Sequence, residues 1–154
     1  MRIWIYQSSR DFSDYEIGEI ESLGLAFVDQ WTSHGANMKA ELKTKYNRFI
    51  LIFADEEQAH ASGCSIDKSV HFIQELEKTF STSLLDRSVV AFRDKNKIST
   101  FKFTEFDTLF SKGLLQEETI IFNNLITSPA ELESNWEIPI NKSWLNKFLT
   151  PAKK

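Results

Sequence analysis

The first half of the chain alternates short apolar runs with longer amphipathic stretches, a pattern typical of strands joined by helices. Residues 3–6 (Ile-Trp-Ile-Tyr) are β-branched and aromatic, which predicts a first strand. Ser13 and Glu16 have the spacing of a capping box and predict the start of a helix. The apolar stripe of this helix recurs with helical spacing and contains Ile17, Ile20, Gly24, Phe27, Val28 and Trp31. A glycine within that stripe indicates close packing of the helix backbone.

Two strands and a second helix follow. Residues 38–46 alternate between apolar and charged positions, which predicts a strand with one face exposed. Residues 49–54 are apolar throughout and predict a central strand that is buried on both faces. A helix begins near Ser65 or Asp67, with His71 on the side opposite its apolar stripe. That stripe consists of Ile66, Val70, Ile73, Leu76 and Phe80.

The second half is predicted to add strands at residues 89–92, 98–103 and 119–122, and short helices after Thr104 and Ser128. Gly113 is expected to end the first of these helices. The order of the first six elements is βαββαβ, which predicts an α+β fold with a ferredoxin-like core. We expect one mostly antiparallel sheet with both long helices on one face, extended by further strands and short C-terminal helices. Residues 1–150 are expected to form a single domain, and residues 151–154 a polar tail.

Composition and charge restrict the possible partners. Of the 154 residues, 42% are hydrophobic and 26% are charged, as in a globular domain, and the net charge of −4 gives no overall attraction for nucleic acid or anionic membranes. With one cysteine the chain forms no intrachain disulfide, which favours a reducing compartment. Neither a signal-peptide pattern nor a long apolar run is found in the sequence, so we expect a cytoplasmic, soluble protein.

The loop before the second predicted helix holds the strongest chemical candidate, Cys64. A thiol at a helix start has a lowered pKa, and His34 could act as its base while Asp67 orients or caps the site. A competing interpretation treats Cys64 as a small buried side chain and Ser65 or Asp67 as a simple helix cap. The further candidate ligand-binding residues are Gly63, Ser65, His60, Trp31 and Arg10.

Other chemistries fit the sequence less well. Lys68-Ser69 aligns with the end of a Walker phosphate loop, but Ser62 and Asp67 stand where the loop requires glycine. Residues 55–57, His60 and Cys64 are metal-ligand types without a zinc-like spacing. Arg10 follows a strand like the phosphate-binding arginine of acylphosphatases, but the glycine-rich phrase of those enzymes is missing. We therefore predict neither a cofactor nor a bound metal.

Several phrases of the chain resemble a known family. They are residues 31–35 (Trp-Thr-Ser-His-Gly), 62–67 (Ser-Gly-Cys-Ser-Ile-Asp) and 122–125 (Phe-Asn-Asn-Leu), together with the ending around Trp136 and Trp144. The chain is similar in these phrases to small uncharacterised bacterial proteins that are often labelled "ABC transporter ATPase". The sequence has neither a Walker loop nor the transporter phrase Leu-Ser-Gly-Gly-Gln, which contradicts that label. The resemblance implies one domain and no particular chemistry.

Two functional hypotheses follow. The leading one is a non-catalytic binding or protein-interaction module, because the sequence holds no complete catalytic set and is rich in aromatic residues, with 13 Phe and 4 Trp. Its candidate partners are a second copy of the chain, an unidentified protein or a small anionic ligand, but neither nucleic acid nor a membrane. The alternative is a small enzyme or an anion- or ligand-binding site in the loop around Cys64.

Overall fold

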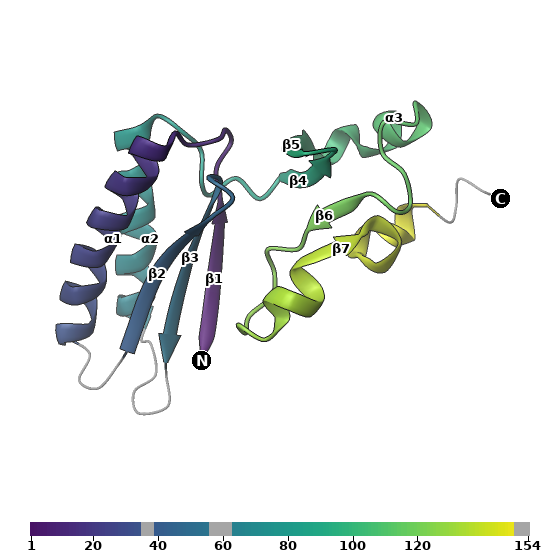
Figure 1. Ribbon diagram of the computed structural model, residues 1–154. Helices are drawn as coiled ribbons and strands as arrows, with labels where there is room; N and C mark the ends of the chain where they lie inside the picture. The colour runs from purple at the N-terminus through teal and green to yellow at the C-terminus, as the bar shows by residue number, and fades with distance from the viewer. Residues whose placement is uncertain (35–38, 56–62, 150–154) are drawn as a thin grey trace. The chain divides into compact units, whose positions relative to one another are not determined.

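The computed structural model describes residues 1–34, 39–55 and 63–149 (Figure 1), and for residues 33, 34 and 63–65 it describes the backbone only. The chain divides into two compact units. The first unit comprises Met1–Leu85 and Thr127–Pro129, and the second comprises Asp86–Ile126 and Ala130–Lys154. The domain expected over residues 1–150 thus contains two units with separate apolar clusters, and each unit is described by itself.

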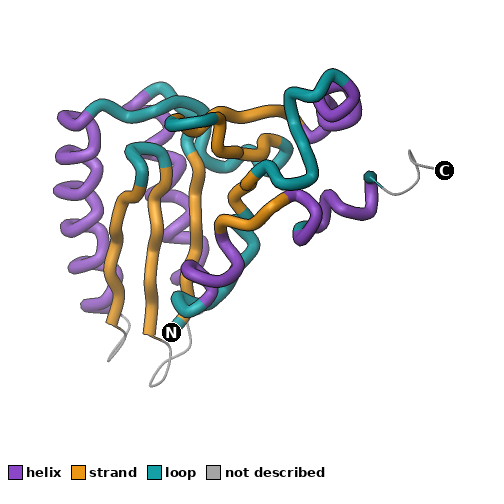
Figure 2. The backbone as a smooth tube through the Cα atoms, turned by 45° about the vertical axis from the view of Figure 1, so that its right-hand side comes forward, coloured by secondary structure: helices purple, strands orange, loops and turns teal. Residues whose placement is uncertain are grey.

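The first unit is a three-stranded antiparallel sheet with two helices on one of its faces (Figures 1 and 2). Its elements in chain order are β1 (Arg2–Gln7), α1 (Asp14–His34), β2 (Lys39–Lys45), β3 (Phe49–Asp55) and α2 (Gly63–Phe80). The spatial order of the strands is β1-β3-β2, so β3 lies in the centre, in agreement with its apolar sequence. The predicted strands and both long helices are confirmed.

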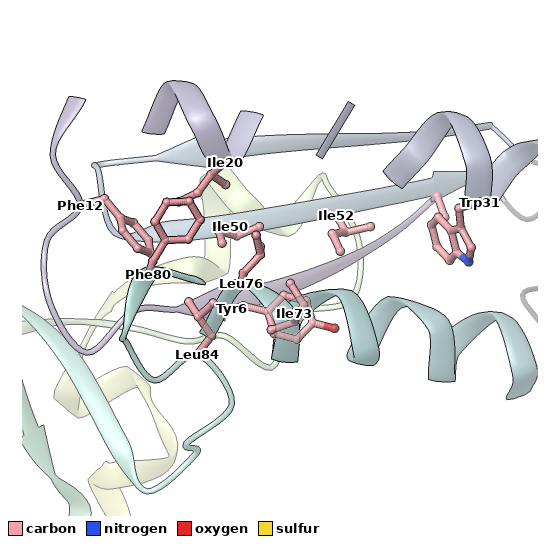
Figure 3. Close-up of a cluster of buried hydrophobic side chains, with 11 residues drawn as sticks. Tyr6, Phe12, Ile20, Trp31, Ile50, Ile52, Ile73, Leu76, Phe80 and Leu84 are labelled. Atoms are coloured by element: carbon pink, nitrogen blue, oxygen red, sulfur yellow. The ribbon is translucent and has the colours of Figure 1, made fainter. Parts of the chain in front are cut away.

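The core of the first unit lies between the helices and the sheet. Its buried side chains are Tyr6, Phe12, Ile20, Trp31, Ile50, Ile52, Ala54, Ile73, Leu76, Phe80 and Leu84. Figure 3 shows Phe12 and Phe80 at one end of this cluster and Trp31 at the other. The cluster combines alternate positions of β3 with the predicted stripes of α1 and α2, so burial of those apolar stripes stabilises the unit.

The start of α1 is built as the sequence predicts. The Ser13 side chain accepts a hydrogen bond from the Glu16 amide at 3.1 Å, and the Glu16 carboxylate accepts one from the Ser13 amide at 2.9 Å. Each side chain therefore satisfies a backbone donor that has no partner within the helix.

The ferredoxin-like strand order is not confirmed. In that order the strand after α2 would pair with the outer edge of β1, but β4 (Val89–Asp94) belongs to the sheet of the second unit. Near that edge, the Ile3 amide instead donates a hydrogen bond of 3.0 Å to the carbonyl of Thr127. The mixed α and β class with antiparallel sheets is confirmed, whereas the single ferredoxin-like sheet is replaced by two sheets.

The second unit has a four-stranded antiparallel sheet in the order β5-β4-β6-β7. Besides β4, it contains β5 (Lys97–Lys102), α3 (Phe106–Ser111), β6 (Ile120–Phe122) and β7 (Glu137–Pro139). Short 3₁₀ or π turns cover Phe103–Glu105, Leu132–Trp136, Ile140–Lys142 and Trp144–Phe148. Gly113 lies two residues beyond α3 with a φ of 76°, as expected of a glycine that ends a helix.

Candidate functional site

Most of the residues predicted from sequence lie at one end of the first unit. The helices α1 and α2 run antiparallel (Figure 1), so His34, the last residue of α1, and Cys64, the second residue of α2, belong to the same end. The side chains of His34, Gly63, Cys64 and Ser65 lie outside the described residues, as does the whole of His60. The thiol site therefore stays a prediction.

Arg10 lies at the opposite end of α2. Its guanidinium donates two parallel hydrogen bonds to the Glu16 carboxylate, at 2.9 and 2.8 Å, and a further one to the carbonyl of Phe80. Phe80 is the last residue of α2, sixteen positions after Cys64, which corresponds to about 24 Å along a helix. The structure thus separates Arg10 from the other candidates, and its guanidinium holds a carboxylate of the chain itself.

This pairing changes the acidity of Glu16. The Arg10 hydrogen bonds, followed by the bond from the Ser13 amide, lower the pKa of Glu16 from 4.5 to about 2. Both effects favour the charged carboxylate, because the donors form stronger hydrogen bonds with the negatively charged oxygens than with a protonated carboxyl group. The cluster links the segment after β1 to the start of α1 and to the end of α2.

A groove between α1 and α2 includes two of the predicted residues, Trp31 and Asp67. It has a volume of about 730 Å³. Its apolar wall is a row of rings in which Phe27 stacks on Phe72 at 4.4 Å between centroids and 7° between planes. Phe27 also stacks on Trp31, at 5.3 Å between centroids. Trp31 is buried, whereas Phe27 and Phe72 are only half-buried and present part of their rings to the groove.

Polar side chains line the rest of this groove. Asp67, Lys68, His71 and Glu75 come from α2, and Gln30 comes from α1. The side chains of His71 and Glu75 are 73% and 53% exposed and lie 3.7 Å apart. Both signs of charge are present, from two carboxylates, one lysine and one histidine. An apolar or aromatic group with polar edges matches such a site, because its faces can pack against the rings and its edges can form hydrogen bonds with the polar side chains of the rim.

A second, more polar groove also borders α2. It is lined by Ser9, Lys78 and residues 81–83, and it shares His71, Gln74 and Glu75 with the aromatic groove. The hydroxyl groups here are bonded to one another: Ser9 and Thr82 are 3.0 Å apart, and Ser8 and Thr82 are 2.7 Å apart. These bonds hold the segment after β1 against the segment after α2.

The sequence did not identify Phe72 as part of a site. It precedes Ile73, which belongs to the buried stripe, so helical periodicity alone placed no function on it. Phe27 was assigned to the core stripe, and in the structure it packs against the core while one part of its ring faces the groove. A signal was present in the doublet Phe72-Ile73, because two adjacent apolar residues widen the apolar stripe of a helix beyond one buried line.

Neither a cluster of metal ligands nor a membrane-spanning helix is found in the described part of the chain. Within residues 1–34, 39–55 and 63–149, no three His, Cys, Asp or Glu side chains come together as metal ligands would. Among the helices of these same ranges, none is both long enough and apolar enough to cross a membrane.

Comparison with known proteins adds no family. Neither the models of protein families, nor the curated proteins, nor the solved structures contain a match to this chain. The resemblance to the small bacterial family therefore stays a prediction.

Proposed function

We propose that this protein is a non-catalytic binding module that takes an apolar or aromatic group of its partner into the groove between α1 and α2. The observation that carries the proposal is the half-buried Phe27–Phe72 stack, which lies on the groove wall beside buried Trp31. Both rings are already held in place by the core on one side. A partner therefore meets a preformed surface and loses little binding free energy to its ordering.

The free energy of such binding comes from removing apolar surface from water. At roughly 25 cal/mol per Å², covering about 100 Å² of ring and partner surface contributes about 2.5 kcal/mol. An aromatic guest gains a further 0.5–1.5 kcal/mol, approximately, from stacking or edge-to-face contact with Phe27 and Phe72. The exposed side chain of Gln74 supplies hydrogen bonds at the rim without adding a net charge.

Indole is a suitable probe, because it combines an aromatic face with one hydrogen-bond donor. We expect titration of the isotope-labelled chain with indole to shift amide resonances of residues 27–31 and 67–75 in a saturable way. The substitution Phe72→Glu places a charge on the groove wall and should abolish these shifts.

The matched control for this titration is Phe103→Glu. Phe103 is 39% exposed and belongs to the second unit, so this variant should bind indole like the unmodified protein. Shifts that are absent from the unmodified protein, or that persist unchanged in Phe72→Glu, would overturn the proposal.

A further inference from the structure

The outer surface of α2 is a ridge between two grooves. Lys68, His71, Glu75 and Lys78 recur at helical spacing along it, and all four are exposed. Of these residues, Lys68 lines the aromatic groove, Lys78 lines the polar groove that includes Ser9, and His71 and Glu75 line both. A ridge of side chains beside a groove is a surface that helices use to pack against one another.

The ridge carries a positive charge at one position along the helix and a negative charge at another. Lys68 lies near the beginning of α2, and Glu75 follows seven residues later. Seven residues are nearly two helical turns, so both side chains lie on one face and are separated by about 10 Å. At that distance they form no direct ion pair within one chain, and each can meet a charge on a partner.

We propose that the aromatic groove is filled by a second copy of this chain, with the α2 ridges of the two copies packed antiparallel about a twofold axis between His71 and Phe72. In this register residue numbers of facing positions add up to 143. Lys68 of each copy then lies opposite Glu75 of the other copy, which makes two equivalent ion pairs. A parallel arrangement would instead place Lys68 opposite Lys68 and Glu75 opposite Glu75, which is repulsive.

The same axis brings the aromatic groups together. Phe72 lies beside the axis, so the half-exposed Phe27–Phe72 stack of one copy meets that of the other. A twofold interface uses the same surface of both copies, and this surface has what such use requires: its own ridge, its own groove and both signs of charge. The inference rests on the proposed function, because it names the partner that the groove receives.

Charge exchange between two variants tests the arrangement. Sedimentation equilibrium of the full chain should show a monomer–dimer equilibrium. Lys68→Glu places only carboxylates at the paired positions, and Glu75→Lys places only ammonium groups there. We expect each variant alone to weaken dimerisation by at least about ten-fold. An equimolar mixture should form a heterodimer of about the original affinity, because both facing pairs become opposite in charge again.

The controls separate this interface from a general effect of charge. Lys112→Glu and Glu133→Lys make the same changes at exposed positions of the second unit and should leave the dimer unaltered. Circular dichroism of each variant establishes that it is folded. The inference would be overturned by a protein that is monomeric at millimolar concentration. It would also be overturned if the α2 variants did not weaken the dimer, or if mixing them did not restore it.

A second copy would compete with indole for the groove, so the indole titration is done at concentrations at which the chain is monomeric. It then distinguishes failure of this inference from failure of the proposed function. A monomeric chain that still shows saturable, Phe72-dependent shifts keeps the binding function and loses only the second copy as its partner. A chain that neither dimerises nor binds indole loses both.

Discussion

Gly24 of α1 lies directly against Leu42 of β2. A Cβ added to this glycine would come within 2.7 and 2.9 Å of the two Leu42 methyl carbons and 3.1 Å of its Cγ. Such distances are shorter than van der Waals contact, so a side chain at residue 24 would require the Leu42 side chain to move. The prediction of close packing from a glycine in an apolar stripe is confirmed.

Two glycines of the same helix give opposite predictions. Gly24→Ala should lower the free energy of unfolding by about 1–2 kcal/mol, because the strain of overpacking exceeds the gain in helix propensity. Gly18 is exposed and a Cβ there meets nothing within 4 Å, so Gly18→Ala should raise that free energy by about 0.5–1 kcal/mol. Urea unfolding of both variants measures the difference. Stabilisation by Gly24→Ala would show that Leu42 moves aside at little cost.

The Arg10–Glu16 pair predicts a loss of stability in acid. The pKa of Glu16 is about 2 in the folded protein and near its ordinary 4.5 when the chain is unfolded. A carboxyl whose pKa is lowered by folding stabilises the fold above its unfolded pKa, and this contribution is lost as the pH falls from 4.5 towards 2. Glu16→Gln should therefore be less stable than the unmodified protein at pH 7 and should lose less stability between pH 5 and pH 2.

A second glutamate of α1 provides the control for this pH series. Glu19 is exposed, so Glu19→Gln should retain the acid-dependent loss that Glu16→Gln diminishes. Urea midpoints measured at several pH values compare the three proteins. Equal acid sensitivity of Glu16→Gln and the unmodified protein would mean that the Arg10 contact contributes nothing to stability.

The strands and helices of the first unit were predictable because their signals are local. The capping box at Ser13, the alternation along β2 and the apolar run of β3 each depend on a few neighbouring residues. The place of β4 was not predictable in this way, since the element order βαββαβ is the same whichever sheet β4 joins. Its pairing with β5 through a short hairpin is local, whereas its absence from the edge of β1 depends on contacts distant in sequence.

The candidate site was predictable only in part. Trp31 and Asp67 line one groove, because antiparallel helices bring the end of α1 to the beginning of α2. Arg10 was grouped with them because it follows a strand and precedes a helix, but its position along α2 depends on helix length and direction. The aromatic wall was not predictable, because Phe27 and Phe72 each have the sequence pattern of a core residue. Only the structure shows that the two rings stack across two helices and form one surface.

The two members of the Arg48–Asp11 ion pair should contribute unequally to the stability of the fold. Its side chain is 8% exposed and donates to the carbonyls of Ser8 and Ser9, at 3.2 and 3.1 Å, and to Asp11 at 2.9 Å. Arg48→Lys leaves at least one of these carbonyls without its donor and should lower the free energy of unfolding by about 1–3 kcal/mol. Asp11 is 65% exposed, so Asp11→Asn should cost less than about 1 kcal/mol. Urea unfolding compares the two, and a larger effect at Asp11 would contradict this assignment.

The turn between β4 and β5 contains a residue in an unfavourable backbone conformation. Lys95 is exposed and has a φ of 59°, in the left-handed region that side chains disfavour by roughly 1–2 kcal/mol and glycine does not. Lys95→Gly should therefore raise the free energy of unfolding, by up to about 1 kcal/mol once the greater freedom of glycine in the unfolded chain is subtracted. Asn96, beside it, has no positive φ, so Asn96→Gly should lower stability instead. Thermal unfolding of the two variants gives the comparison, and destabilisation by both would show that the Lys95 side chain contributes more than its backbone strain costs.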